Sequence, residues 1–121
     1  AIQNGENDNN PKTGGDPTWQ PLINTPNFPE YTSGHVAYSS TVARILKLFF
    51  KTDQVTFTVT ALNPLAVQKT RTYTSLSDAV DETIDARVYV GIHFRNSDEV
   101  AGEQGKRIAK WTFKHFLRPL K

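Results

Sequence analysis

The sequence contains no cysteine among its 121 residues. Without thiols the chain has neither a disulfide framework nor a thiolate metal site, and cysteine usage says nothing about its redox compartment. Proton transfer near neutral pH then depends above all on three histidines, His35, His93 and His115. These side chains are therefore the first to examine for catalytic chemistry.

Long hydrophobic runs and a strong excess of charge are also missing. No stretch of eighteen apolar residues occurs, so we do not expect a membrane-spanning helix. The opening residues 3–10 (QNGENDNN) lack the basic and then apolar pattern of a secretory signal, although an exported precursor stays open. Fourteen Lys and Arg against twelve Asp and Glu give a net charge of +2, which predicts no nucleic-acid partner. We expect a soluble chain of undetermined location.

Composition divides the chain into a polar start and one domain. Residues 1–18 are rich in Asn, Gly, Asp and Pro and cannot bury enough apolar surface to offset the entropy lost on ordering, so we expect a flexible segment or loop. Three prolines, Pro21, Pro26 and Pro29, disfavour helix in the following part and predict an extended arm lying on the core. The remaining length allows one modest domain.

Apolar periodicity predicts two helices in the middle of the chain. Residues 36–50 carry a helical apolar stripe, and Ser33 is placed to cap the amino terminus of that helix. A second helix begins after Ser75 or Ser77, and Gly91 is placed to end it.

A hairpin and a third helix complete the predicted elements. Between the first two helices, β-branched residues alternate in residues 55–60 and 70–74 around a turn, which predicts a small hairpin. The third helix starts at about Asp98, and acidic residues precede basic ones along it, in the sense that the helix dipole favours. The sequence thus predicts a mainly α fold, part of a helical bundle of about three helices with a small β-hairpin insertion.

Two motifs some fifty residues apart hold the side chains best suited to chemistry. The first, PEYTSGH, offers the Ser33 hydroxyl, the Gly34 amide without a Cβ in the way, and the His35 imidazole. The second, ARVYVGIHFR, adds the guanidinium of Arg87 and the imidazole of His93. These groups are the parts needed to hold a tetrahedral oxyanion and to move protons around it, so we interpret them as an oxyanion site.

Each of these residues also has an ordinary structural explanation. Ser33 fits a helix cap, and His35 fits polar surface at a helix start. His93, between two apolar neighbours, fits a boundary histidine with one satisfied nitrogen. Arg87 fits a salt bridge to one of three carboxylates, Asp81, Asp85 or Glu99. The functional interpretation depends on the residues acting together.

Taken jointly, the two motifs carry a resemblance to a known superfamily. The stretch FPEYTSGH, which ends at His35, and Arg87 followed by five residues and His93 resemble the second and third signature motifs of the vanadium-dependent haloperoxidases and the type 2 phosphatidic acid phosphatases. The likeness runs over roughly residues 19–117. It implies that residues 19–121 are the carboxy-terminal part of a helical haloperoxidase-like or phosphatase-like domain.

The resemblance implies a role for each residue of the two motifs. His93 is implied to be the imidazole bonded to vanadium, or the nucleophile towards phosphorus in the phosphatases. His35 is implied to be the acid/base. Ser33, the Gly34 amide and Arg87 are implied to donate hydrogen bonds to the equatorial oxygens of the anion.

The sequence departs from the superfamily pattern at several positions. Thr32 stands where the pattern has proline, and Ala86 where it has serine. Ser97 occupies the place of an aspartate that would orient His93, with Asp98 one position late. The first signature motif, a Lys followed six residues later by Arg-Pro, is absent. Two cationic anchors for the anion are therefore missing, and the chain resembles the carboxy-terminal portion of a larger protein.

The resemblance implies a vanadate-dependent haloperoxidase that uses hydrogen peroxide to oxidise a halide, with vanadate as cofactor. Two alternatives stay open. One is an acid phosphatase of the same superfamily, which takes a phosphate ester and forms a phosphohistidine at His93. The other is a non-catalytic half-domain that packs on a partner. In each case an upstream segment or a partner chain is expected to complete the site.

Overall fold

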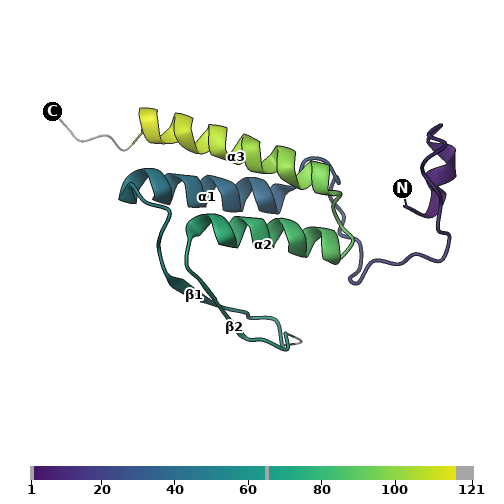
Figure 1. Ribbon diagram of the computed structural model, residues 1–121, viewed down its shortest axis with the longest axis horizontal. Coiled ribbons are helices and arrows are strands. Elements are labelled where there is room, and N and C mark those ends of the chain that lie inside the picture. The colour runs from purple at the N-terminus through teal and green to yellow at the C-terminus, as the bar shows by residue number, and fades with distance from the viewer. Residues whose placement is uncertain (1, 65, 117–121) are drawn as a thin grey trace.

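The computed structural model describes residues 2–64 and 66–116 and shows a mainly α fold. Its main elements are three helices and two strands, α1 (Gly34–Phe50), β1 (Phe57–Thr60), β2 (Thr70–Tyr73), α2 (Leu76–Tyr89) and α3 (Arg95–His115). The helices lie side by side with α1 in the middle, and the hairpin projects away from them (Figure 1). The predicted fold class, helices with a small hairpin insertion, is confirmed.

The hairpin connects α1 to α2 through an antiparallel pair of short strands. Phe57 lies opposite Tyr73, and their ring centroids are 5.3 Å apart. Thr58 lies opposite Thr72, with their hydroxyl oxygens 2.8 Å apart. These cross-strand pairs explain why alternating β-branched residues at these positions form strands.

The ends of α2 follow from local sequence signals. Ser75 is the N-cap, and its hydroxyl accepts a hydrogen bond of 3.0 Å from the Asp78 amide, so helix initiation at Ser75 is confirmed over Ser77. After Tyr89 the chain reverses at Gly91, which has a φ of +78°. The Gly91 amide donates to the Val88 carbonyl, and the next amide donates to the Arg87 carbonyl, the two bonds of a Schellman motif. The predicted role of Gly91 as a helix stop is thereby confirmed.

The third helix starts earlier than the predicted Asp98. Phe94 is its N-cap, Arg95 its first residue, and Asp98 lies in the first turn. A long-range contact explains the difference, because the Phe94 amide donates a 2.8 Å hydrogen bond to the Glu30 carboxylate. A helix start stabilised by a residue 64 positions away has no local sequence signal. The basic end of the helix is as predicted, except that Arg118 lies outside the described residues.

Small residues let α1 and α3 approach closely. A side chain at Gly105 of α3 would place its Cβ 2.5 Å from the Ala37 carbonyl oxygen and 2.9 Å from the Ser40 Cβ. The Ser40 hydroxyl donates a 2.7 Å hydrogen bond to the Gly102 carbonyl across the same contact. The core beside it is small and consists mainly of Val36, Val80 and Ala101, with Ala37, Ala43 and Ile84 packed against them.

Gly105→Ala should destabilise the fold by about 1–3 kcal/mol, because the new methyl meets backbone atoms that cannot turn aside. Gly102→Ala is the matched control. Its Cβ would meet only the Val36 Cγ1 at 3.7 Å, and alanine favours helix, so stability should stay the same or rise by up to about 1 kcal/mol. Urea unfolding of both variants tests the pair. Equal free energies of unfolding would show that the helices are not held at this distance.

The amino-terminal part contains one element that the sequence did not predict. A short 3-10 helix, η1 (Ile2–Asn7), lies where a flexible segment is expected, and the Asp16 amide donates to the Ile2 carbonyl. The arm that follows has no regular element, as predicted. Its Leu22 amide donates to the Val90 carbonyl at 3.1 Å, and the Trp19 ring fills the space beside Gly91. The arm is thus ordered by contacts at the end of α2.

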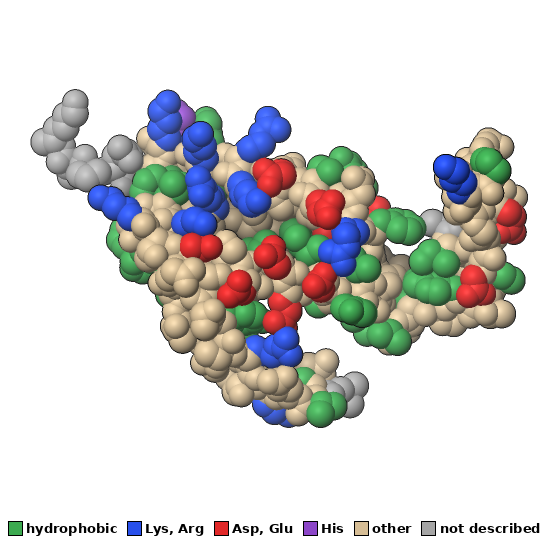
Figure 2. Space-filling view, in the orientation of Figure 1, with side chains coloured by type: hydrophobic (Ala, Val, Ile, Leu, Met, Phe, Trp, Pro, Cys, Tyr) green, Lys and Arg blue, Asp and Glu red, His purple; other side chains and the backbone are tan. Residues whose placement is uncertain are grey.

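Charges on the helix surfaces are segregated. Figure 2 shows Lys and Arg side chains gathered over the carboxy-terminal half of α3, where Lys106, Lys110 and Lys114 are exposed, and acidic side chains along α2 and the middle of the molecule. Within the described residues, each helix is too short or too polar to cross a membrane.

Candidate active site

The reversal at Gly91 brings His93 into the interior beside the start of α1. Its imidazole side chain is fully buried, and Nδ1 lies 2.6 Å from the backbone carbonyl oxygen of Glu30. A carbonyl oxygen can only accept, so the hydrogen bond requires a proton on Nδ1. In the neutral imidazole the other nitrogen, Nε2, then carries a lone pair. This Nε2 is buried without a hydrogen-bond partner among the described residues.

The phenyl ring of Phe28 brings the two motif histidines into one neighbourhood. Its centroid lies 5.8 Å from that of the His93 ring, in a stacked arrangement, and 6.3 Å from that of the His35 ring. Two imidazoles from segments far apart in sequence therefore flank a single aromatic side chain.

Ser33 occupies the N-cap position of α1, but its side chain does not cap the helix. The residue is fully buried, and its hydroxyl has no hydrogen-bond partner in the described part of the chain. Ser33 is thus the N-cap residue, as predicted, but its hydroxyl does not make the capping hydrogen bond and lies near the Asp98 carboxylate instead. At the next position, a Cβ added to Gly34 would meet nothing within 4 Å, so space is open beside the first turn.

Arg87 lies on the last turn of α2, near enough to His35 and Asp98 to interact with both electrostatically. Its Nε and one terminal nitrogen, Nη2, are buried without a hydrogen-bond partner among the described residues. Partial burial lowers the pKa of the guanidinium, and the nearby Asp98 carboxylate acts in the opposite sense. The simple surface salt bridge does not form with Asp85, which instead pairs with Arg95 at 2.8 Å.

Asp98 is completely buried in the first turn of α3. Burial raises the pKa of its carboxyl, while the Ser33 hydroxyl, His93 and Arg87 lie close enough to lower it. Neither carboxylate oxygen has a partner within hydrogen-bonding geometry among the described residues. These neighbours therefore act on Asp98 through their electrostatic fields and not through hydrogen bonds. Asp98 is therefore a buried carboxyl group beside the site, in addition to the Glu30 carboxylate near His93.

The orientation of His93 does not come from Asp98. Glu30 supplies the acceptor for Nδ1 through its backbone carbonyl, and the Ser97 hydroxyl donates to the same oxygen at 2.7 Å. No role was predicted for Glu30, because a backbone carbonyl is available at every residue and carries no sequence signal.

His35 lies on the first turn of α1 and is exposed to solvent. Partial desolvation lowers the pKa of its imidazole, and the positive fields of Arg87 and His93 lower it further. The imidazole is therefore kept mainly neutral near pH 7, in the form that accepts a proton. The same fields place His35 near Arg87 and His93.

A cavity of about 1060 Å³ opens beside His93, under the amino-terminal arm. Aromatic side chains contribute much of its wall, namely Trp19, Phe28, Tyr89 and Phe94. Its other lining residues include Glu30 and Arg95 but neither Ser33, His35 nor Arg87. The two imidazoles are thus neighbours, but only the imidazole of His93 lines this cavity.

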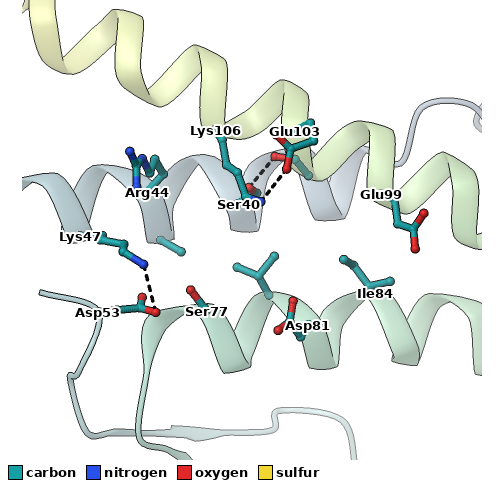
Figure 3. A pocket seen from close by; sticks show the side chains of 13 residues that line it. Ser40, Arg44, Lys47, Asp53, Ser77, Asp81, Ile84, Glu99, Glu103 and Lys106 are labelled. Carbon is teal, nitrogen blue, oxygen red and sulfur yellow. Dashed lines mark hydrogen bonds and ion pairs between the residues drawn. The ribbon is translucent and has the colours of Figure 1, made fainter.

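A second cavity, of about 240 Å³, lies between the three helices and has different chemistry (Figure 3). It is lined by charged side chains that include two ion pairs, Lys47 with Asp53 at 3.1 Å and Lys106 with Glu103 at 2.6 Å. No histidine lines it, and neither do the other residues of the two motifs. We therefore assign the candidate site to the His93 region. No cluster of three or more His, Asp and Glu side chains suited to a metal ion occurs within residues 2–64 and 66–116.

Comparison with solved structures shows the same fold in vanadium-dependent peroxidases. The structure is similar to that of the first bacterial vanadium-dependent iodoperoxidase, with a TM-score of 0.72 and 34% identity over 82% of this chain and 24% of that chain. It also resembles a bacterial vanadium-dependent chloroperoxidase in its apo and holo forms, with TM-scores of 0.67. Identity there is 17% over 79% of this chain and 23% of the apo chain, and 19% over 81% and 23% for the holo form.

The chain thus spans about a quarter of the length of the structures that it matches. No curated protein sequence matches it. The family described as the VCPO second helical-bundle domain matches residues 2–121, nearly the whole chain. Because this match covers nearly the whole chain and the fold is shared, the chain belongs to the VCPO second helical-bundle domain family.

Proposed function

We propose that this chain supplies the histidine-bearing half of a vanadate site in a haloperoxidase that oxidises halide with hydrogen peroxide. One observation carries the proposal. Among the described residues, the buried polar atoms without hydrogen-bond partners in this region are the Ser33 hydroxyl, two guanidinium nitrogens of Arg87, the Nε2 of His93 and the two carboxylate oxygens of Asp98. Buried polar groups normally have partners, so a set of unpaired ones at one place indicates a ligand.

The chemistry of these atoms fits vanadate. The Ser33 hydroxyl and the Arg87 N–H groups are donors suited to the oxygens of a tetrahedral anion, and the open space beside Gly34 leaves room for its amide to join them. The Nε2 lone pair of His93 is suited to a direct bond to vanadium. When bound, vanadate supplies the activation of hydrogen peroxide towards a halide. His35, with its lowered pKa, would accept a proton from peroxide at the edge of the site.

The site in this chain lacks enough positive charge. Asp98 offsets the charge of Arg87, and the Lys and Arg-Pro anchors of the superfamily's first motif are absent. We therefore propose that a further segment or partner chain supplies these cations. The length of the solved relatives, about four times that of the matched region, supports this arrangement.

Iodide is the first halide to test, because the matched structure with 34% identity is an iodoperoxidase, whereas the chloroperoxidase shares less than 20%. We expect the reconstituted full-length protein, meaning this chain together with the segment that carries the missing cations, to oxidise iodide with peroxide only after vanadate is added. Hydrolysis of p-nitrophenyl phosphate by the vanadate-free protein is the comparison. Phosphatase activity without vanadate-dependent peroxidase activity would reject the proposal and favour the phosphatase alternative.

A further inference from the structure

Glu30 joins the two motif segments through both its backbone and its side chain. Its carbonyl oxygen accepts from His93 Nδ1 at 2.6 Å and from the Ser97 hydroxyl at 2.7 Å. Its carboxylate oxygen Oε1 accepts from the Phe94 amide at 2.8 Å and lies 3.6 Å from His93 Nδ1. One residue of the first motif therefore contacts His93 and Phe94 of the second motif and also Ser97, just beyond it.

The side-chain bond places the Glu30 carboxylate at the residue that follows His93. The Phe94 amide belongs to the N-cap residue of α3, and a carboxylate is favoured there by the unpaired amides of the first turn. The backbone carbonyl of Glu30 itself lies against the neighbouring His93 ring, 2.6 Å from Nδ1. Phe28 stacks on this ring, so rotation of the imidazole is restricted by a hydrogen bond and by an aromatic neighbour.

We propose that Glu30 is a positioning residue, whose side chain holds its own carbonyl against His93 Nδ1 and thereby keeps the proton on Nδ1 and the Nε2 lone pair turned into the site. The effect on an anion rests on the proposed function of His93. The effect of Glu30 on the His93 tautomer does not rest on that function, so the proposed tautomer control and the proposed function can fail independently.

The position of the Glu30 side-chain oxygen that accepts from the Phe94 amide matters more here than the negative charge of the carboxylate. The Glu30 side chain is 39% exposed, and a partly exposed charge is screened by water. A glutamine retains a carbonyl oxygen that can accept from the Phe94 amide, whereas an alanine retains nothing beyond Cβ. Glu30→Gln should therefore behave like the wild type, and Glu30→Ala should not.

The first test uses the 121-residue chain without vanadate. Side-chain ¹⁵N shifts, recorded at about pH 8.5 where an ordinary imidazole is neutral, report which nitrogen of His93 carries the proton. We expect the Nδ1–H tautomer in the wild type and in Glu30→Gln, and a mixture with the Nε2–H tautomer in Glu30→Ala. The Phe94 amide should exchange with solvent roughly tenfold faster in Glu30→Ala, because a single hydrogen bond is lost. Glu103→Ala, which removes an exposed carboxylate elsewhere on α3, is the matched control.

The second test measures vanadate affinity in the reconstituted full-length protein. Loss of a group that orients a ligand imidazole typically weakens binding about 10–100-fold, and we expect this for Glu30→Ala but less than about threefold for Glu30→Gln. The wild-type tautomer and affinity in Glu30→Ala would overturn the inference, and so would equal losses in both variants. A wild-type protein that has the Nδ1–H tautomer but binds no vanadate would instead reject the proposed function.

Discussion

Replacing His93 by alanine should abolish vanadate binding, whereas replacing His35 should leave most of the vanadate bound and reduce turnover about 10²- to 10⁴-fold. The difference follows from their surroundings. His93 is buried, its Nε2 has no hydrogen-bond partner among the described residues, and this nitrogen is proposed to bond directly to vanadium. His35 is exposed on the first turn of α1, with a lowered pKa suited to proton transfer. Vanadium content and iodide oxidation, measured in the reconstituted full-length protein, separate the two effects.

The chain contains its own control for this experiment. His115 lies near the end of α3, stacked on Trp111 with ring centroids 4.8 Å apart, and its Nδ1 lies 2.7 Å from the Trp111 carbonyl oxygen. His115→Ala should keep both vanadium and activity. Equal loss of vanadium in the His35 and His93 variants, with circular dichroism unchanged, would show that the ligand and acid/base roles are wrongly assigned. Unchanged peroxidase and phosphatase activity in both would reject an enzyme at this site.

The isolated 121-residue chain should bind vanadate about 10²- to 10⁴-fold more weakly than the reconstituted full-length protein. Two charge-assisted donors are missing, and each is worth roughly 1.5–3 kcal/mol, which gives this range of affinity. The buried Asp98 acts in the same direction, because it places a negative charge beside the proposed anion site. Calorimetric titration with orthovanadate measures both affinities.

A variant of the same chain distinguishes specific from non-specific binding in that titration. His93→Ala in the isolated chain should remove whatever specific vanadate binding remains, whereas binding to the basic surface of α3 would be unaffected. Submicromolar binding by the unmodified chain would contradict the prediction and would show that the site is complete without the first motif.

Local signals in the sequence were sufficient for most of the secondary structure. The Ser75 cap and the Gly91 stop are short-range effects, since each depends on residues within one or two turns. The hairpin likewise depends on alternating residues in two nearby strands. Which residues of α1 the glycines of α3 meet was not predicted, because interhelical packing depends on which helix faces meet.

The sequence by itself determined which chemical groups the chain has and, through motif spacing, which of them to examine together. Only the tertiary structure decided what each group contacts. Among the described residues, the Ser33 hydroxyl does not cap α1, and two buried nitrogens of Arg87 have no hydrogen-bond partner. The tertiary structure also oriented His93 through the Glu30 carbonyl instead of Asp98. The start of α3 was decided in the same way. The physical reason is that these hydrogen bonds join atoms more than sixty residues apart, and backbone acceptors leave no trace in residue identity.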